Sequence, residues 1–264
     1  MQYCVRNTVM KRMKKQLIRY IFLSAMCMMI AFSVVAQERT VQNRPYTDLR
    51  PFHFGILVGT HLQDLEFHNI GVQQVVDGGG TPSEMLISTD QDRWDAGFTV
   101  GVLGELRLND YFAFRVAPAL YFGTRHLTLR NHTQTTATGR LVEQQQELKT
   151  AYISTACDII YAAQRFNNRR PYVMLGVNPM VNLSGKSQDY IKLKRYDLFL
   201  EAGVGCDFYL PFFKLRPELK FLYGLTNSLD TRHADELKDK AMRVYTNSVD
   251  RSHSKMIVLT FYFE

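Results

Sequence analysis

Apolar and polar residues alternate along eight stretches of the chain, which is the period of β-strands whose two faces meet different surroundings. The predicted strands cover residues 52–62, 93–107, 111–126, 148–162, 170–183, 195–210, 213–226 and 253–263. Helical spacing of apolar residues is weak, and its best example is residues 234–245. The pattern therefore predicts an all-β fold.

The connections between these strands alternate in length. Strands two and three are joined by "NDY", strands four and five by "RFNNR", and strands six and seven meet around Pro211. The other connections, residues 63–92, 127–147, 184–194 and 227–252, are long and polar. Short turns at one end and long loops at the other are typical of an antiparallel up-and-down barrel.

Each predicted strand has a charged face and an apolar face. The apolar face of strand seven, for example, carries Phe213, Leu215, Leu219, Phe221 and Tyr223. The charged faces together hold seven cations and seven anions: Arg93, Arg107, Arg115, Arg125, Lys214, Arg216 and Lys220, with Asp95, Glu105, Asp158, Asp197, Glu201, Asp207 and Glu218. Because buried charges need partners, this balance suits a charge network enclosed by the strands.

Periodicity alone leaves the orientation of the faces open. A soluble lipocalin-like barrel turns its apolar face inward, and an outer-membrane barrel turns it toward lipid. Residues without side chains make room inside a narrow barrel for the long side chains beside them. Only Gly104 falls on the apolar face, whereas the charged face holds Gly55, Gly59, Gly97, Gly101, Gly123, Gly176, Gly203, Gly205 and Gly224. The glycines therefore favour the charged face as the inner one.

The strand ends agree with a membrane barrel. The closing segment "MIVLTFYFE" places four apolar residues on one face, and aromatic residues stand near strand ends at Trp94, Tyr111, Phe112, Phe212 and Phe213. Aromatic girdles of this kind lie at the two membrane interfaces of outer-membrane barrels. We expect an eight-stranded OmpX/OmpW-like transmembrane barrel whose own side chains fill its interior.

The amino terminus predicts export. Residues 1–36 combine "KRMKKQLIR", the apolar run "YIFLSAMCMMIAFSVVA" and small residues before Gln37, as a cleaved signal peptide does. A membrane anchor is the alternative, although the run is short for a helical span. We assign residues 1–36 to the signal peptide, 37–51 to a periplasmic leader and 52–264 to a barrel in the cell outer membrane.

Composition changes the picture in two ways. The formal charge is +7, but six basic residues and no acidic residue lie in the signal peptide, which leaves about +1. A nucleic-acid partner is therefore not expected. The mature part keeps Cys157 and Cys206, both within predicted strands, and we interpret them as small apolar residues before considering a disulfide.

No catalytic, cofactor or metal site is predicted. Some eight-stranded outer-membrane barrels modify lipids with a His, a Ser and an acid, and this chain has two groups of such residues: His126 with His132, and Ser248, Asp250, Ser252 and His253. Neither group has a spacing specific to a mechanism or to a metal. We expect a protein that is not an enzyme and has no cofactor.

The first strand and its leader are more specific. The stretch "RPYTDLRPFHFGILVGTHLQDLEF" resembles the amino-terminal region of PorT-type proteins, outer-membrane barrels of the type IX secretion system. The residues that carry the resemblance are Phe52, His53, Phe54, Gly55, Gly59 and Asp64. The stretch covers about one tenth of the chain, and no residue after it is matched individually.

The resemblance implies a non-enzymatic component needed for export of adhesins and proteases, and in some members for gliding motility. Its partners would be outer-membrane lipid and other components of the secretion system. Two alternatives remain open: a generic OmpX/OmpW-like barrel for adhesion or small-solute passage, and a barrel enzyme that modifies lipid A.

Overall fold

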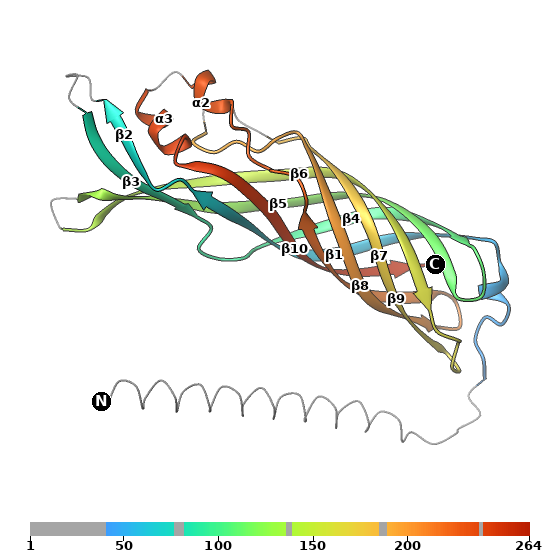
Figure 1. Ribbon diagram of the computed structural model, residues 1–264. Helices are drawn as coiled ribbons and strands as arrows, with labels where there is room; N and C mark the ends of the chain where they lie inside the picture. The colour runs from blue at the N-terminus through green and yellow to red at the C-terminus, as the bar shows by residue number, and fades with distance from the viewer. Residues whose placement is uncertain (1–40, 77–81, 136–138, 185–188, 238–239) are drawn as a thin grey trace, which may run out of the picture. The chain divides into compact units, whose positions relative to one another are not determined.

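The computed structural model describes residues 41–264, apart from 77–81, 136–138, 185–188 and 238–239 (Figure 1). Residues 42–264 form one compact unit. The predicted signal peptide and the first residues of the predicted leader lie outside the described residues. No helix in the described part of the chain is long and apolar enough to cross a membrane.

The described residues form ten strands and three short helical segments. In chain order they are η2 (Thr47–Leu49), β1 (Phe52–Asn69), β2 (Val72–Val76), β3 (Pro82–Asp90), β4 (Asp95–Arg107), β5 (Phe112–Thr135), β6 (Leu141–Ala162), β7 (Arg169–Asn182), β8 (Tyr196–Tyr209), β9 (Lys214–Gly224), α2 (His233–Glu236), α3 (Lys240–Thr246) and β10 (Val249–Phe263).

Eight of the strands form a ring of antiparallel pairs. The order runs β5-β4-β1-β10-β9-β8-β7-β6, and β6 pairs again with β5. The first and last strands of the barrel, β1 and β10, are therefore neighbours, in register from Ile56 opposite Phe263 onward. Closure of the sheet leaves no unpaired edge within the ring, which is the condition for crossing lipid with strands.

All eight predicted strands are confirmed, although the lengths of several were wrong. Strand β1 continues to Asn69, β5 to Thr135, and β6 begins at Leu141, because these strands extend past the ring at the end with the long connections. The predicted loop 63–92 also contains the hairpin β2–β3, whose strand β3 pairs with β5 through Ile87–Asp90. We call the extended parts of β5 and β6 with this hairpin the outer extension.

The two faces of the ring have the predicted orientation. The strand residues that turn inward include Arg115, Asp158, Glu201 and Glu218, all 0 or 1% exposed. Outward residues such as Leu175 are half exposed and belong to an apolar belt around the ring. Cys157 and Cys206 are free thiols on this outward face.

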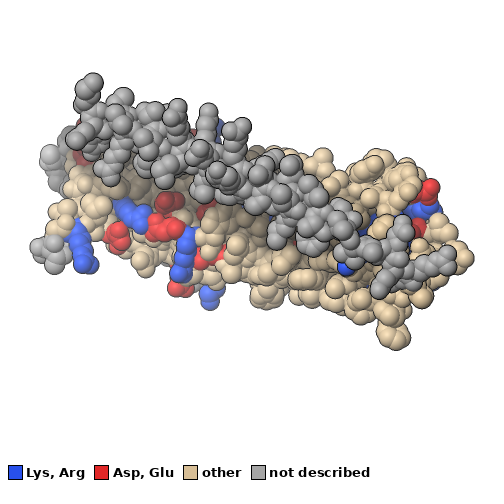
Figure 2. Space-filling model, turned by 90° about the horizontal axis from the view of Figure 1, so that it is seen from below, with Lys and Arg blue, Asp and Glu red and all other residues tan. Residues whose placement is uncertain are grey.

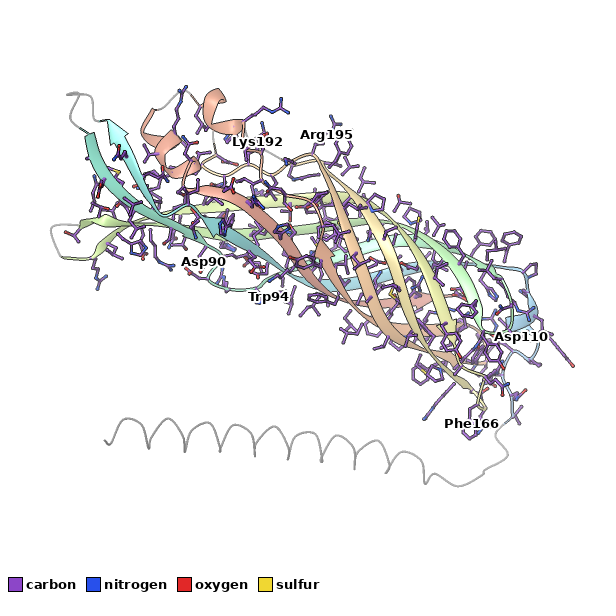
Figure 3. The ribbon with its side chains drawn as sticks, in the orientation of Figure 1. Asp90, Trp94, Asp110, Phe166, Lys192 and Arg195 are labelled. Atoms are coloured by element: carbon purple, nitrogen blue, oxygen red, sulfur yellow. The ribbon has the colours of Figure 1, made fainter. Side chains whose placement is uncertain are left out.

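The distribution of charged side chains is consistent with an apolar belt around the ring (Figures 2 and 3). Figure 2 shows charged side chains gathered toward the two ends of the described surface, with a stretch of other residues between them. Figure 3 places Asp110 and Phe166 at the end with short turns, and Trp94 and Arg195 near the opposite border of the ring. Since outer-membrane barrels have short periplasmic turns and longer external loops, we expect the short-turn end to be periplasmic.

Candidate functional site: the filled interior and its two caps

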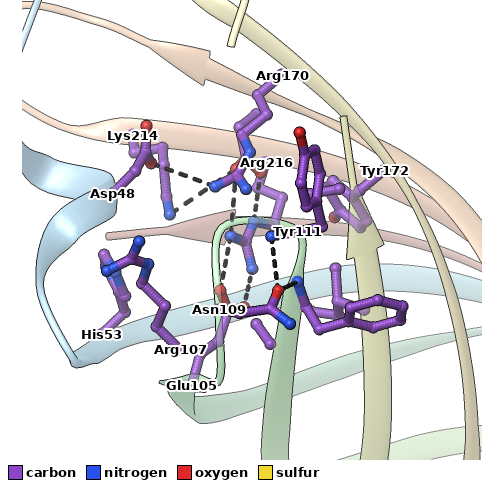
Figure 4. Close-up of a pocket in the computed structure, with 15 residues that line it drawn as sticks. Asp48, His53, Glu105, Arg107, Asn109, Tyr111, Arg170, Tyr172, Lys214 and Arg216 are labelled. Atoms are coloured by element: carbon purple, nitrogen blue, oxygen red, sulfur yellow. Dashed lines mark hydrogen bonds and ion pairs between the residues drawn. The ribbon is translucent and has the colours of Figure 1, made fainter. Parts of the chain in front are cut away.

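A group of ion pairs fills the periplasmic end of the interior; we call it the periplasmic cluster (Figure 4). Arg216 is the centre: its Nε donates to Asp207 Oδ1 at 2.6 Å, its Nη1 pairs with Glu105, and Glu264 Oε1 lies 3.3 Å away. Lys214 pairs with Glu264 as well. The hollow beside these side chains has a volume of about 20 Å³, which is room for about one water molecule.

A second group lies in the middle of the ring; we call it the central cluster. Arg115 donates from Nε to Asp158 Oδ2 at 3.1 Å and from Nη2 to Glu218 Oε2 at 2.7 Å, and all three side chains are fully buried. Lys220 Nζ lies 3.5 Å from Glu201 Oε1 and 3.9 Å from Glu218 Oε1. Side chains from β5, β6, β8 and β9 are thus connected across the interior.

Two residues of the predicted network do not belong to it. Arg93 precedes β4 by two residues, so its side chain is 67% exposed and pairs with Asp95 at 3.3 Å. Arg107 ends β4 and pairs with Asp110 in the following turn. The prediction of an interior charge is wrong for Arg93, which stands before the strand begins, whereas Arg107 lies half-buried beside the hollow of the periplasmic cluster. The other twelve are buried, five of them cations and seven acids.

Neutral donors satisfy the surplus of acids. Glu218 accepts hydrogen bonds from the hydroxyls of Tyr172 at 2.7 Å and Tyr262 at 2.9 Å. Glu201 accepts one from Asn178 Nδ2 at 2.9 Å. These hydrogen bonds add to the ion pairs of the two carboxylates and favour their charged form. Sequence reasoning missed these three donors, although their even positions on β7 and β10 place them on the inner face.

Arg125 lies farther toward the outer end and has no carboxylate within ion-pair distance among the described residues. Its Nε donates to Gln63 Oε1 at 3.0 Å and its Nη1 to Ser254 Oγ at 3.1 Å. Ser228 Oγ lies 3.4 Å from Ser254 Oγ and donates to Asp197 Oδ2 at 2.5 Å. Two hydroxyl groups therefore connect this guanidinium to Asp197.

Apolar side chains also fill part of the interior, so the lumen is not lined by charged residues alone. This buried group consists of Leu57, Leu103, Ala117, Ala119, Tyr121, Tyr152, Ala156, Met180, Phe199, Leu222, Met256, Val258 and Tyr262. The predicted network of charges from wall to wall is therefore divided by packed aliphatic and aromatic side chains. Such packing excludes water as effectively as paired charges do.

The long connections fold over the outer mouth and close it with an apolar cap. The Gln146 side chain holds the β7–β8 connection by accepting from the Ile191 amide at 2.9 Å and donating to its carbonyl at 2.8 Å. Tyr245 of α3 packs edge-on against Tyr190, with ring centres 5.7 Å apart. The buried members of this outer cap are Leu65, Leu127, Leu129, Leu148, Ile191, Leu193, Leu229 and Val249.

The described part of the leader closes the periplasmic mouth. Tyr209 donates its hydroxyl proton to Asp48 Oδ1, 2.5 Å away, within η2. The Arg165 guanidinium lies 3.6 Å from the centre of the Tyr209 ring and donates to the backbone carbonyls of Asn43 and Arg44. The leader is thus attached to the β6–β7 turn and to the end of β8, and we call this arrangement the periplasmic cap.

The residues of the PorT-like stretch fall on both faces of β1. Phe52 and Phe54 are 58% and 75% exposed on the outward face at the periplasmic border. His53 turns inward, where its Nδ1 lies 3.5 Å from Glu264 Oε2. Asp64 is half-buried on the outward face near the outer border. The exposed rings of Phe52 and Phe54 are placed as aromatic residues at a membrane interface are.

The two glycines of this stretch lie on the inner face along the seam between β1 and β10. A Cβ on Gly59 would lie 2.6 Å from the Leu259 carbonyl oxygen, and one on Gly55 would overlap the Phe263 carbonyl oxygen. The first and last strands therefore approach each other more closely than side chains at these positions would allow.

The histidines near the outer border make only partial catalytic arrangements. His126 Nδ1 lies 2.8 Å from Asp95 Oδ1, but within the described residues no hydroxyl is hydrogen-bonded to its Nε2. Ser88 Oγ lies 2.7 Å from His132 Nε2, and no described acid is paired with that ring. A nucleophile, a base and an orienting acid are thus not assembled on either histidine.

The residues near the last strand are not assembled either. Ser252 is buried on the inner face of β10, while His253 turns outward and lies near the Gly224 carbonyl oxygen, 3.1 Å from Nδ1. Successive strand residues point to opposite faces, so their closeness in sequence does not bring them together. Among the described residues no three His, Cys, Asp or Glu side chains form a group that could hold a metal ion.

Comparison with known proteins identifies the type of barrel. The family model for "Outer membrane protein beta-barrel domain" matches residues 35–230, which is more than half of the chain. The chain belongs to this family. It is an outer-membrane β-barrel protein, and the apolar belt is the surface that contacts lipid.

Two solved outer-membrane proteins resemble this outer-membrane barrel at low similarity. Neisserial surface protein A matches with a TM-score of 0.37 and 12% identity over 81% of this chain and 98% of that chain. Ail, the attachment invasion locus protein of Yersinia pestis, solved with the heparin analogue sucrose octasulfate, matches with a TM-score of 0.35 and 13% identity over 81% of this chain and 99% of that chain. No curated protein sequence matches this one.

The filled interior makes a prediction about conductance. Reconstituted in planar bilayers, the outer-membrane barrel is expected to give no steady current, because two ion-pair clusters, an apolar layer and two caps lie along any path through it. A porin reconstituted in the same bilayers serves as the positive control. A reproducible ohmic conductance that grows with the amount of protein would contradict this account of the interior.

Proposed function

We propose that this outer-membrane barrel is a non-enzymatic component of the type IX secretion system, needed for export of adhesins or proteases. The observation that carries the proposal is the PorT-like stretch with Phe52, His53, Phe54, Gly55, Gly59 and Asp64. Its partners would be other secretion components, together with the lipid around the belt.

The packed interior supports a role outside the conduction path. An exported protein has no route between the central cluster and the walls, where Arg115, Asp158 and Glu218 are fully buried. The work of the barrel would therefore lie at its rims, as a rigid docking piece fixed in the membrane. This is consistent with a component that assembles or anchors an export apparatus without serving as its channel.

The periplasmic rim offers a surface for such partners. Tyr46 beside η2, Phe166 in the β6–β7 turn and Phe212 in the β8–β9 turn are 78%, 72% and 92% exposed. Exposed aromatic residues are enriched in protein interfaces because they bury a large area at a low cost in conformational entropy. We propose that these three residues contact a periplasmic partner of the secretion system.

Deletion of the gene is expected to abolish secretion of protease or adhesin, and a plasmid copy is expected to restore it. A copy carrying Tyr46→Ser, Phe166→Ser and Phe212→Ser should form the barrel without restoring secretion, since the partner loses its aromatic contacts. The measurements are secreted protease activity and heat-modifiable migration of the barrel on gels. Unchanged secretion after deletion would reject the role in export.

The same strains separate the other functions. The exposed apolar residues Val72, in the outer extension, and Ile70, just before it, favour adhesion as the second candidate; they are 60% and 56% exposed. In that case deletion would reduce surface attachment and leave secretion intact. A lipid-modifying enzyme would instead change the mass spectrum of lipid A, which we expect to be identical in both strains.

A further inference from the structure

Two external loops are joined into a firm platform at the outer border of the belt. Leu193 of the β7–β8 connection and Leu229 of the β9–β10 connection form an isolated β-bridge, and both side chains are buried. The Lys194 amide donates to the Ser228 carbonyl at 2.8 Å, and the Asp230 amide donates to the Lys192 carbonyl at 2.9 Å. The backbone that carries the outward side chains of this platform is therefore held in place.

Three cations point outward from the platform around one hollow. Lys194, Arg195 and Arg232 are exposed and line the hollow together with Tyr196, Asp230 and Thr231. None of the three cations has an ion-pair partner among the described residues. The one acid that lines the hollow, Asp230, is 3.8 Å from the ammonium group of Lys192, a fourth cation. The hollow is therefore strongly positive.

Two other cations toward the outer end of the barrel are paired. Arg130 donates to both Asp92 and Glu143, at 2.6 and 3.1 Å, and its hydrogen bond lowers the pKa of the Asp92 carboxyl. Lys255 lies 2.5 Å from Glu66. The arrangement around Lys194 is thus not a general feature of the outer border. It leaves cationic groups available for an anion, since no described carboxylate pairs with them.

The hollow stands directly above lipid-facing residues. Tyr196 begins β8 and is 68% exposed, and Leu198 and Leu200 continue the same outward row into the belt. Leu183, which directly follows the neighbouring strand β7, is 58% exposed. Figure 3 places Arg195 near the border that Trp94 marks on another side of the ring. An anion bound here would have acyl chains immediately beneath it.

We propose that Lys194, Arg195 and Arg232 bind the phosphate groups of a phosphorylated glycolipid of the outer leaflet. Guanidinium groups bind phosphate through two parallel charge-assisted hydrogen bonds, and a lysine adds a compact charge. The acyl chains of the same lipid would lie along Leu198 and Leu200, so one molecule would use both the positive hollow and the apolar row. The proposal does not depend on the role in secretion.

The test compares lipids that differ only in phosphate. The detergent-folded barrel, with its full mature chain, is titrated with bisphosphorylated lipid A, with dephosphorylated lipid A and with inorganic phosphate, and binding is followed by native mass spectrometry. Bisphosphorylated lipid A is expected to bind best. The triple variant Lys194→Gln, Arg195→Gln and Arg232→Gln should weaken its binding about tenfold or more, since three charge-assisted contacts are lost.

The control changes the same number of charges at the paired sites. Arg93→Gln, Arg130→Gln and Lys255→Gln together should leave lipid A binding within about twofold of the wild type, since these cations are already compensated. Heat-modifiable migration verifies that both variants fold. Equal loss of binding in the two variants, no loss in the first, or equally tight binding of dephosphorylated lipid A or of inorganic phosphate would each overturn the proposal.

Discussion

Valine in place of Gly59 is expected to prevent normal closure of the barrel. A Cβ at this position would lie 2.6 Å from the Leu259 carbonyl oxygen and 2.9 Å from Thr99 Cγ2, so β10 must move away from β1. The backbone of β10 has little freedom to move, because its register with β1 continues through thirteen consecutive pairs from Phe263 to Arg251. Overpacking of this kind costs about 3 kcal/mol at the upper end of its usual range.

The control for this substitution is Gly104→Val. Gly104 is the glycine on the outward face of β4, and the nearest atom to an added Cβ is a Phe54 ring carbon 3.8 Å away. Valine there adds a β-branched residue to a lipid-facing strand and should be tolerated. Urea unfolding in lipid vesicles, with heat-modifiable migration as the readout of closure, compares the two. Equal stability of the two variants would show that the seam is not closely packed.

Removing Arg115 is expected to destabilise the barrel by about 3–5 kcal/mol, the usual cost of breaking a buried ion pair from one side. The Arg115→Met variant fills a similar volume but leaves Asp158 buried without a cation and Glu218 with only Lys220, 3.9 Å away. The loss of stability relative to the wild type should be smaller at acidic pH, because protonated carboxyl groups no longer need a positive partner. Urea unfolding of both proteins at neutral and at acidic pH measures the loss of stability and how much of it disappears in acid.

The matched variant is Arg251→Met. Arg251 is also on a barrel strand and also has a carboxylate neighbour, Asp250, but its side chain is 67% exposed. Exposed pairs contribute little to stability, so no measurable change is expected. A loss for Arg115→Met as small as that for Arg251→Met would mean that water reaches the central cluster.

Much of the barrel was predictable because a strand that separates lipid from a packed interior must alternate. Parity assigned Arg115 and Glu218 to one face and Leu219 to the other without any knowledge of pairing. The same parity failed for Arg93, since it depends on where a strand starts. Residues at strand ends have no fixed face until the pairing partner is known.

Other features depend on contacts distant in sequence. The hairpin β2–β3 owes its place to a short pairing with β5, and its own residues have little alternation to signal it. The outer cap could not be predicted, because Ile191 and Leu229 are single apolar residues within polar connections. The donors Tyr172 and Tyr262 were missed since an aromatic residue on a strand suits a membrane interface as well as an interior hydrogen bond.

The presence of several independent barriers inside one narrow cylinder has a consequence for the envelope of the cell. If either cap were lost, the clusters and the apolar layer would still block the passage of small solutes through the barrel. Changes in the external loops are therefore expected to leave the interior closed to small solutes. The sequence of the external loops and the permeability of the barrel are therefore expected to be independent of each other.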